Sequence, residues 1–185
     1  MMMAHKPKTT YRYKTIVVPY ARMSGNNHIK IFLFKDRESG DMTFVTGGCK
    51  QNEDAYICAS RELQEESKNT LTLSSMQNMS VFSFETKYRP PAHAKDDARR
   101  NLNNVITKYV VYIIKTPFTS EADLDDYRKS YINSVVGNAK AYNETTDVVF
   151  ATPNDILTKK YRIWDFLQKE VVPQVMPYFK AGRIP

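Results

Sequence analysis

Three carboxylates fall close together in the first half of the chain, at positions 62, 65 and 66. The surrounding apolar residues repeat at helical spacing, and at about 100° per residue Glu62, Glu65 and Glu66 share an arc of roughly 100° on the predicted helix. Like charges four residues apart, such as Glu62 and Glu66, cost a helix about a few tenths of a kcal/mol. A divalent cation bound between them removes that cost, and Mg²⁺ and Mn²⁺ prefer clustered oxygen ligands and bridge readily to phosphate. The acidic face therefore indicates metal-dependent chemistry on a phosphorylated substrate.

The helix that must position these carboxylates is expected over residues 54–68. Ala55, Ala59 and Leu63 recur at i, i+4 and i+8 and form the apolar stripe that packs on a sheet. Arg61 lies one turn before the second of the three carboxylates, where it can neutralise or aim a carboxylate. Acidic faces are also common on solvated helices that bind nothing. The helix alone therefore does not distinguish a metal site from a solvated surface.

The wider spacing separates these two interpretations. The segment follows the pattern G-x5-E-x7-R-E-U-x-E-E, in which U is an aliphatic residue. The seven matching positions are Gly47, Glu53, Arg61, Glu62, Leu63, Glu65 and Glu66. With average residue usage, such a match should arise by chance in on the order of 10⁻⁶ to 10⁻⁵ of chains this long. The segment resembles the Nudix box, the sequence signature of Nudix hydrolases, and the layout of the flanking elements resembles that family from about residue 11 to 172.

The resemblance implies a metal site and a role for each of its residues. The backbone carbonyl of Gly47 would be a metal ligand, and Glu62, Glu65 and Glu66 would share the binding of Mg²⁺ or Mn²⁺. Glu62 would also be the catalytic general base for water. The reaction would be substitution by water at phosphorus, in which metals neutralise the charged oxygens and lower the pKa of bound water. The loop after Gly48 is one residue shorter than in many members, so either Gly47 or Gly48 could donate the carbonyl.

The resemblance also implies one ion pair, and the chain departs from the family at the end of the helix. Glu53 would pair with Arg61 and hold the loop against the helix. After the last box glutamate the family continues x-G-U, whereas this chain has Ser67, Lys68 and Asn69. Asn69 can adopt the left-handed conformation that glycine provides at a helix end. We therefore expect the helix exit to change and the metal ligands to stay in place.

Many Nudix enzymes supply a further carboxylate from the loop before the last strand. Here that region is residues 143–147, in which Glu144 is the first candidate for a catalytic and metal-binding carboxylate and Asp147 is the alternative. A solvated acidic turn explains the same residues equally well, because no fixed spacing ties them to the box.

Periodicity and turn residues predict a chain of mixed strands and helices. Strands are expected over residues 11–20, 28–35, 42–46, 71–73, 81–88, 105–115 and 147–152. Helices are expected over residues 54–68 and 120–136, from Pro153, and over 163–172, where Pro173 would end the last one. Without strict alternation, this order predicts an α+β fold, an α/β/α sandwich with a mixed sheet between helices. Residues 1–10 are expected to be a disordered lead-in and residues 11–185 a single domain.

Length, charge and cysteine content limit the partners. The 185 residues suffice for one domain with a sizeable core, and no apolar run approaches the roughly 20 residues of a membrane span. The net charge of +7 favours phosphorylated or polyanionic partners. Cys49 and Cys58 match neither a metal-ligand pattern nor a disulfide framework, which favours a reducing, intracellular and cytoplasmic location. Nothing in the sequence indicates an oligomeric state.

Two basic clusters could contact phosphates. A polar loop is expected over residues 89–101, between two strands, and a second cluster covers residues 159–162. The candidate phosphate or RNA contacts are Arg89, Lys95, Arg99, Arg100, Lys159 and Lys160. Asp96 and Asp97 make an ordinary solvated loop an alternative.

Aromatic residues at strand ends could stack on a base, although aromatic residues in strands more often belong to the core. They are Tyr11, Tyr13, Tyr20, Phe84 and Tyr88. Trp164 has helical spacing with Ile163 and Leu167 and is expected to serve packing.

The resemblance fixes a reaction class and leaves several substrates open. The basic clusters favour the capped 5′ end of RNA, and the acid-rich helix at residues 120–136 resembles helices added in decapping Nudix enzymes, including those of large DNA viruses. A nucleoside triphosphate or another nucleotide is the next candidate, and a diphosphorylated inositol polyphosphate is the third. A catalytically inert Nudix-like binding module is the non-enzyme alternative. Such modules lose box carboxylates, whereas all of them are present here.

Overall fold

The computed structural model describes residues 8–137 and 139–180. Most of the expected lead-in, residues 1–7, lies outside the described residues, and Thr10 already begins the first strand. Asn138 and residues 181–185 also lie outside them.

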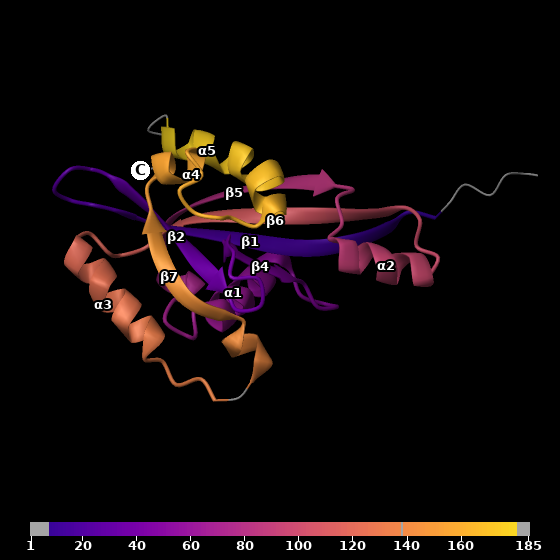
Figure 1. The fold of residues 1–185 in the computed structure, drawn as a ribbon, viewed down its shortest axis with the longest axis horizontal. Coiled ribbons are helices and arrows are strands. Elements are labelled where there is room, and N and C mark those ends of the chain that lie inside the picture. Colours follow the sequence, from indigo (N-terminus) through magenta and orange to yellow (C-terminus); the bar gives the residue numbers. More distant parts are fainter. Residues whose placement is uncertain (1–7, 138, 181–185) are drawn as a thin grey trace, which may run out of the picture.

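A mixed sheet forms the centre of the fold (Figure 1). In the described part of the chain its seven strands are β1 (Thr10–Arg22), β2 (Ile29–Asp36), β3 (Met42–Thr43), β4 (Val45–Gly48), β5 (Gln77–Thr86), β6 (Val105–Lys115) and β7 (Thr145–Ala151). Their order is β3-β2-β1-β6-β5, with β4 paired to β1 and β7 to β2. β1 and β6 are parallel, from Thr10 beside Val105 to Tyr20 beside Lys115, whereas the other pairs are antiparallel. The predicted mixed sheet is confirmed.

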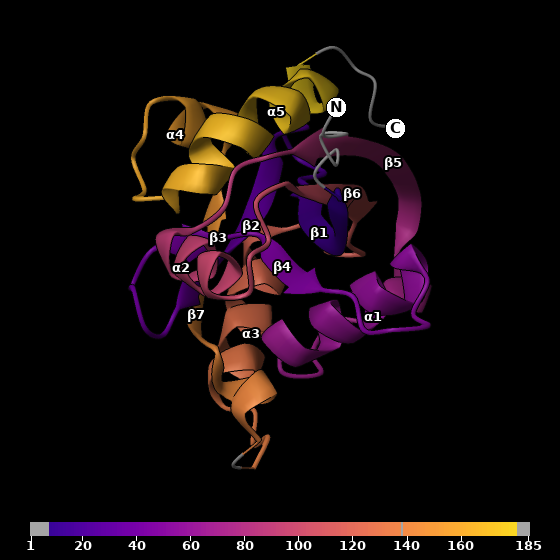
Figure 2. The same ribbon diagram turned by 90° about the vertical axis from the view of Figure 1, so that its right-hand side faces the viewer.

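Helices cover both faces of this sheet (Figures 1 and 2). The helices are α1 (Ala55–Glu66), α2 (Pro91–Arg99), α3 (Glu121–Ile132), α4 (Pro153–Leu157) and α5 (Val172–Lys180). Ile16 and Val18 of β1 point to the face covered by α4 and α5, and Val17 points to the face covered by α1 and α3. This alternation follows from the two-residue repeat of a strand. Both faces bury apolar side chains, and the predicted α/β/α sandwich is confirmed.

Helix α1 follows the predicted pattern at both ends. Its N-cap is Asp54, whose side chain accepts a hydrogen bond from Ile57 N at 2.8 Å. Ala59 and Leu63 are fully buried in the core below the sheet. At the C-terminal end Asn69 has φ +60° and donates to the carbonyl of Gln64 at 2.8 Å. Asn69 therefore takes the left-handed conformation expected of it.

The capping residues expected from the sequence mark the first residues of two further helices, α3 and α4. Ser120 caps α3 in a capping box with Asp123, as expected, although α3 ends at Ile132 rather than near residue 136. Thr152 caps α4, and Pro153 occupies its first turn as predicted.

The sequence analysis was wrong about two short strands. The strand expected over residues 42–46 is divided, because Met42–Thr43 pairs with β2 whereas Val45–Gly48 pairs with β1. The strand expected at residues 71–73 is absent, and a 3-10 turn, η1 (Leu73–Ser75), occurs there. The apolar residues Leu71 and Leu73 anchor this segment in the core without strand pairing.

The polar loop expected over residues 89–101 is mostly helix α2. Pro91 fits its first turn, where a missing N–H costs no helical hydrogen bond. Asp97 is fully buried and accepts hydrogen bonds from Arg12 and Arg89, which ties the helix to the end of β1. A buried carboxylate held by two guanidinium groups is a tertiary contact that polar composition alone does not predict.

Pro173 does not end the last helix. A π-helical turn, η3 (Leu167–Val171), precedes it, and Val172 N–H donates to the carbonyl of Leu167. This wider turn relieves the clash of a proline ring with the preceding turn, so α5 continues to Lys180. Within the described residues, no helix combines the length and the apolar character that crossing a bilayer requires.

Candidate active site

The loop between β4 and α1 is held against its neighbours by short-range hydrogen bonds. Cys49 N donates to the carbonyl of Tyr13 at 3.0 Å, so the loop leaves the sheet beside β1. Lys50 N donates to Glu53 Oε2 at 2.8 Å, and Glu53 N donates to the carbonyl of Lys50 at 3.1 Å. These bonds bring the Glu53 carboxylate back toward α1.

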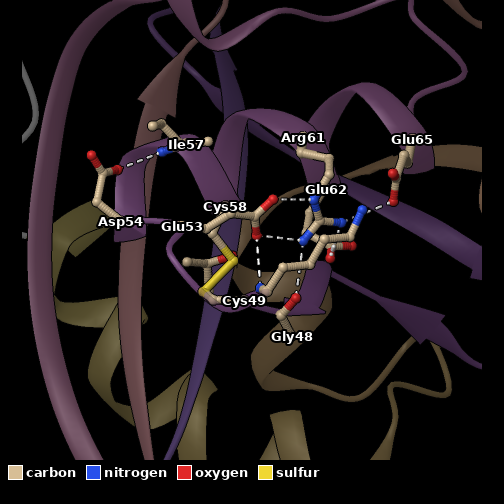
Figure 3. The surroundings of a disulfide bond; sticks show 11 residues. Gly48, Cys49, Glu53, Asp54, Ile57, Cys58, Arg61, Glu62 and Glu65 are labelled. Carbon is tan, nitrogen blue, oxygen red and sulfur yellow. Dashed lines mark hydrogen bonds and ion pairs between the residues drawn. A yellow bond between two sulfur atoms is a disulfide. The ribbon is translucent and has the colours of Figure 1, made fainter.

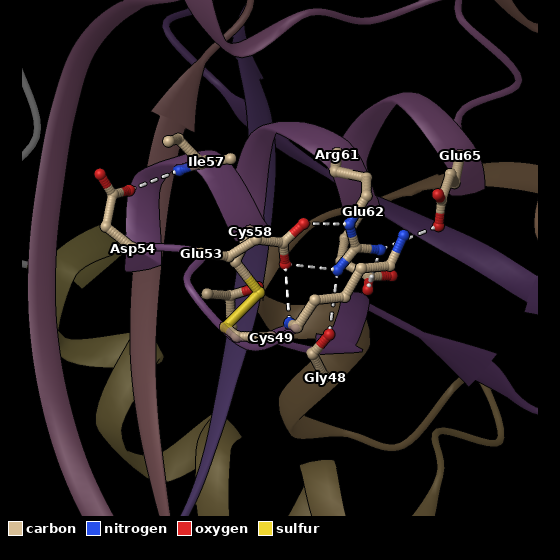
Figure 4. A network of polar contacts seen from close by, with 11 residues as sticks. Gly48, Cys49, Glu53, Asp54, Ile57, Cys58, Arg61, Glu62 and Glu65 are labelled. Atoms are coloured by element: carbon tan, nitrogen blue, oxygen red, sulfur yellow. Dashed lines mark hydrogen bonds and ion pairs between the residues drawn. A yellow bond between two sulfur atoms is a disulfide. The ribbon is translucent and has the colours of Figure 1, made fainter.

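Arg61 connects this loop to the acidic face of α1 (Figure 4). Its Nε and Nη2 donate to the two carboxylate oxygens of Glu53 at 2.7 and 2.9 Å, and Nη2 also donates to the carbonyl of Gly48 at 3.0 Å. Its Nη1 donates to Glu62 Oε1 at 2.6 Å and to Glu65 Oε2 at 3.2 Å. The hydrogen bonds from Arg61, and then that from the Lys50 backbone, lower the pKa of Glu53 to about 2. The structure therefore brings the expected Glu53–Arg61 pair together.

A disulfide joins the same loop to α1 (Figure 3). Cys49 and Cys58 are bonded, with their α carbons 5.2 Å apart. Cys58 is fully buried and its sulfur lies 3.5 Å from Thr15 Oγ1 of β1. The sequence analysis, which assigned these cysteines to no disulfide, was wrong. The strand-to-helix reversal brings them together, and a spacing of nine residues does not reveal it.

Glu66 is a buried carboxylate that is only half satisfied. It is 5% exposed, and its Oε1 accepts a hydrogen bond from Thr46 N at 3.1 Å. Its Oε2 is buried and has no hydrogen-bond partner in the described part of the chain. Burial raises the pKa of Glu66 well above its usual range, and the nearby carboxylates of Glu62 and Glu144 raise it further. A cation beside Oε2 would remove this penalty.

Gly47 leaves room for the carboxylate of Glu62. A Cβ at Gly47 would lie 1.8 Å from Glu62 Cδ, whereas a Cβ at Gly48 would meet nothing within 4 Å. Burial raises the pKa of Glu62, and the hydrogen bond from Arg61 opposes that rise. The Gly48 carbonyl already accepts a hydrogen bond from Arg61. Of the two glycines, Gly47 is therefore the one whose α carbon lies against a carboxylate, and the Gly48 carbonyl is already engaged by Arg61.

The structure places Glu144 near the buried carboxylates and Asp147 elsewhere. Glu144 follows a 3-10 turn, η2 (Lys140–Asn143), and lines a cavity of about 290 Å³ together with Glu66. Burial raises the pKa of Glu144. Asp147 instead receives two hydrogen bonds from Arg128 of α3, at 2.9 and 2.8 Å. Those bonds turn its carboxylate toward α3.

The donor set fits a hard divalent cation. Glu62, Glu66, Glu144 and the carbonyl of Gly47 supply oxygen alone, which is the preference of Mg²⁺ and Mn²⁺. Among the described residues, no three His, Cys, Asp or Glu side chains already stand in an arrangement that could hold an ion. Arg61 engages Glu62 and Glu65 on one side of the helix. The unpartnered Oε2 of Glu66 is the observation that favours a cation at this site.

Three of the six basic residues proposed for RNA contact are already engaged. Arg89 donates to buried Asp97 and to the carbonyl of Leu102. Arg99 pairs with Asp96 at 3.5 Å and Lys160 with Asp155 at 3.4 Å. Lys95, Arg100 and Lys159 are exposed. The two clusters lie on α2 and after α4, which are separate helices in Figure 1.

Two residues near the carboxylates were not assigned to the site from the sequence. Lys14 and Trp164 both line the cavity that holds Glu66 and Glu144. Lys14 is a single charge in the run Tyr13-Lys14-Thr15-Ile16, and a charge entering a buried strand is a signal that could have identified it. Trp164, assigned to packing, also contacts Phe166 at 5.2 Å between ring centroids. It serves both the core and the cavity.

The fold of the chain is similar to those of several solved structures. The chain is similar to a NUDIX hydrolase of Nitrosomonas europaea, with TM-score 0.55, 11% identity, and coverage of 95% of this chain and 92% of the other. The NUDIX domain of Shewanella oneidensis NrtR bound to ADP-ribose gives TM-score 0.53, 11% identity and coverage of 90% and 87%. The Ap4A hydrolase of C. elegans gives TM-score 0.51, 15% identity and coverage of 93% and 97%.

No family model and no curated protein sequence matches the chain. The likeness therefore lies in the fold, and it covers nearly the whole length of each structure. With the box at residues 47–66 on its loop and first helix, the chain has the Nudix fold.

Proposed function

We propose that the protein is a metal-dependent hydrolase that cleaves a phosphoanhydride bond in a nucleoside-diphosphate-linked substrate. The observation that carries this proposal is the buried carboxylate of Glu66, whose Oε2 has no partner among the described residues. It lies beside a cavity shared with Glu144 and belongs to a complete Nudix box. A buried carboxylate oxygen without a hydrogen-bond partner is costly in free energy unless a cation binds it.

Each box residue has a role in this proposal. Glu62, Glu65, Glu66, Glu144 and the carbonyl of Gly47 would hold Mg²⁺ or Mn²⁺. The bound metal would neutralise charge on the phosphate oxygens and lower the pKa of water. Arg61, through Glu53, fixes the loop that follows Gly48 and orients Glu62.

Glu62 is suited to move the proton of the attacking water. Its Oε1 accepts a hydrogen bond from Arg61, which leaves Oε2 as the proton acceptor. Burial raises its pKa, which brings a carboxylate closer to the pKa that favours general base catalysis. As the water oxygen bonds to phosphorus, its proton passes to Glu62 and the P–O bond to the departing phosphate breaks.

Nucleotide substrates are supported by the proteins of the same fold. One is an Ap4A hydrolase and another is bound to ADP-ribose. Both ligands carry nucleosides on a phosphoanhydride chain. The positive net charge of +7 favours the approach of such anions.

Capped RNA remains the finer candidate that the basic clusters suggest. Lys95 and Arg100 of the α2 region are exposed, and Arg99 has an exposed side chain. A strand of RNA leaving the site could contact them through its phosphates. The ion pairs of Arg89, Arg99 and Lys160 reduce the positive charge available for such contacts.

One assay tests the reaction. Ap4A, ADP-ribose, a nucleoside triphosphate, capped RNA and a diphosphoinositol polyphosphate are incubated with Mg²⁺ or Mn²⁺ and with EDTA. We expect phosphoanhydride cleavage of a nucleotide that EDTA abolishes. Hydrolysis that survives full chelation would exclude the metal mechanism, and no cleavage of any substrate would favour the inert binding module.

Salt dependence separates RNA from small nucleotides. If RNA binds, affinity falls by about 0.7 log units per tenfold rise in salt for each phosphate contacted on a single strand. Replacing Arg99 and Arg100 with Ala should flatten that slope and leave hydrolysis of a free cap dinucleotide unchanged. Cleavage of a free nucleotide without activity on capped RNA would exclude the RNA candidate.

A further inference from the structure

Three hollows of the surface converge on Lys14 of β1. The largest, about 640 Å³, lies between residues 11–14 and the loop that follows Gly48. A second, of about 290 Å³, contains Glu66 and Glu144, and a third, of about 270 Å³, contains Arg12, His93 and Arg100. Lys14 lines all three. Lys14 is therefore the residue that the hollow with the carboxylates and the largest hollow have in common.

Lys14 is a partly buried cation that no anion contacts directly among the described residues. Among residues 8–137 and 139–180, no ion pair or hydrogen bond of its ammonium group is present. Burial lowers the pKa of Lys14, the charge of Arg12 lowers it further, and the charge of Glu62 opposes the fall. A half-desolvated charge of this kind is unfavourable until an anion reaches it. The position between the hollows suits a phosphate group of the substrate.

The neighbouring charges reinforce this preference for an anion. Arg12 and Arg89 share the single carboxylate of Asp97, so this trio keeps one positive charge. In the largest hollow the carboxylate of Glu53 is engaged by Arg61, and Lys50 lines the same wall. The potential around Lys14 is therefore positive on the side away from Glu62.

The largest hollow also presents aromatic surface. Tyr11 is 47% exposed and Tyr13 is 58% exposed. They stand two residues apart on β1, so they share one face of the strand, whereas Lys14 points to the opposite face. The hollow is lined by residues of both faces. Lys108 Nζ lies 4.6 Å from the ring centroid of Tyr11. Exposed rings beside cations are the surface on which nucleobases stack.

We propose that this hollow binds the nucleoside of the substrate, with its base against Tyr11 and Tyr13 and its phosphate chain bound by Lys14 on the way to Glu66. This inference rests on the proposed function and deepens it, because it assigns the residues that bind the base and the phosphate chain. A volume of about 640 Å³ lies within the usual range of small-molecule sites. An inositol polyphosphate has no ring that would use the two tyrosines.

Binding without turnover tests this assignment. The probes are ADP and inorganic pyrophosphate, whose dissociation constants are measured by equilibrium dialysis in EDTA, where the metal reaction is stopped. The variants are Lys14→Gln, Lys14→Arg and the double variant Tyr11→Ser/Tyr13→Ser. The matched controls are Lys115→Gln and Tyr56→Ser. Lys115 lies at the C-terminal end of β6, beside Tyr20 and away from Lys14, and Tyr56 is 44% exposed on α1. Circular dichroism establishes that each variant is folded.

We expect Lys14→Gln to weaken both probes about tenfold or more and Lys14→Arg to restore most of that binding. The tyrosine double variant should weaken ADP about fivefold or more, as loss of base stacking does, and leave pyrophosphate unchanged. Neither control should change either affinity. Equal ADP affinity in wild type and the tyrosine variant, or equal pyrophosphate affinity in wild type and Lys14→Gln, would overturn the inference. Either result can coexist with metal-dependent hydrolysis, so it would leave the proposed function standing.

Discussion

The α carbon of Gly47 faces the carboxylate of Glu62 with no space between them for a methyl group. A Cβ at Gly47 would lie 1.8 Å from Glu62 Cδ and 2.1 Å from each carboxylate oxygen. Because the φ of Gly47 is not positive, alanine fits the backbone and the fold should persist. Gly47→Ala should therefore displace Glu62 and reduce turnover about tenfold or more, the usual cost of disturbing a metal site's supports.

The matched control for this variant is Gly48→Ala, since a Cβ there meets nothing within 4 Å. Steady-state turnover against Mg²⁺ concentration distinguishes the two variants. Only Gly47→Ala should need more metal. Equal metal dependence in both would contradict the proposed position of the Glu62 carboxylate.

Arg61→Ala should impair both activity and stability. The change removes the donor to Glu53, Glu62, Glu65 and the Gly48 carbonyl at once. Turnover should fall about tenfold to a hundredfold, as is usual when the group that orients a ligand is lost. Arg61→Lys keeps the charge without the fork that bonds both oxygens of Glu53, so it should lie between wild type and Arg61→Ala. Thermal unfolding and turnover, measured together, check the order of the three proteins.

Acid should weaken the loop through Glu53. The pKa of this carboxyl is about 2 in the folded protein, below its ordinary value of 4.5. Its contribution to the free energy of unfolding is therefore complete above pH 4.5 and is lost as the pH falls toward 2. Urea unfolding between pH 6 and 3 should show a smaller decline for Glu53→Gln than for wild type. Glu85→Gln, which removes an exposed pair with Lys108, should keep the wild-type decline.

Glu66→Gln should abolish most turnover and stabilise the metal-free protein. A neutral amide is a poor ligand for a hard cation, so the rate should fall at least about tenfold. In EDTA the amide also removes a buried acid whose ionisation burial disfavours and whose Oε2 has no partner in the described chain. The melting temperature in EDTA at pH 8 should therefore rise, whereas Asp125→Asn, an exposed change on α3, should leave it unchanged. A turnover near that of wild type would show that Glu66 is not a ligand.

Reduction of the disulfide should destabilise the protein. The Cys49–Cys58 bond closes a short loop, and a loop of this length contributes on the order of 2–3 kcal/mol in the chain-entropy account. Urea unfolding with and without dithiothreitol should show a loss of that size in wild type. Cys49→Ser should unfold identically under both conditions. Alkylation of Cys49 in unreduced native protein would contradict the pairing.

The site could be predicted where its geometry is local. Glu62 and Glu66 lie on one helical turn, and their shared side follows from the helical repeat alone. The bounds of β6, Val105–Lys115, coincide with the predicted strand because its apolar run is continuous and has clear ends. The cap at Ser120 and the first-turn position of Pro153 were also evident from residue type.

The remainder depends on contacts between distant segments. Lys14 meets Glu66 and Glu144 in one cavity only because β1, α1 and the segment before β7 converge. Helix α2 is fixed by Asp97 and Arg12, which are far apart in the chain. Pro173 stays within a helix because a π-helical turn precedes it. A local pattern contains none of this information.

The parallel pairing of β1 with β6 has a consequence for the order of folding. Helix α1 and its loop can form early because their contacts are local. The centre of the sheet can close only when Val105 is available to pair beside Thr10. Glu144 and Trp164, which line the cavity, lie still further along the chain. Closing so long a loop costs chain entropy before any contact offsets it, and non-local pairing of this kind slows folding. The contacts within the acidic helix therefore need only neighbouring residues, whereas the hollow beside it needs segments as far along the chain as Trp164.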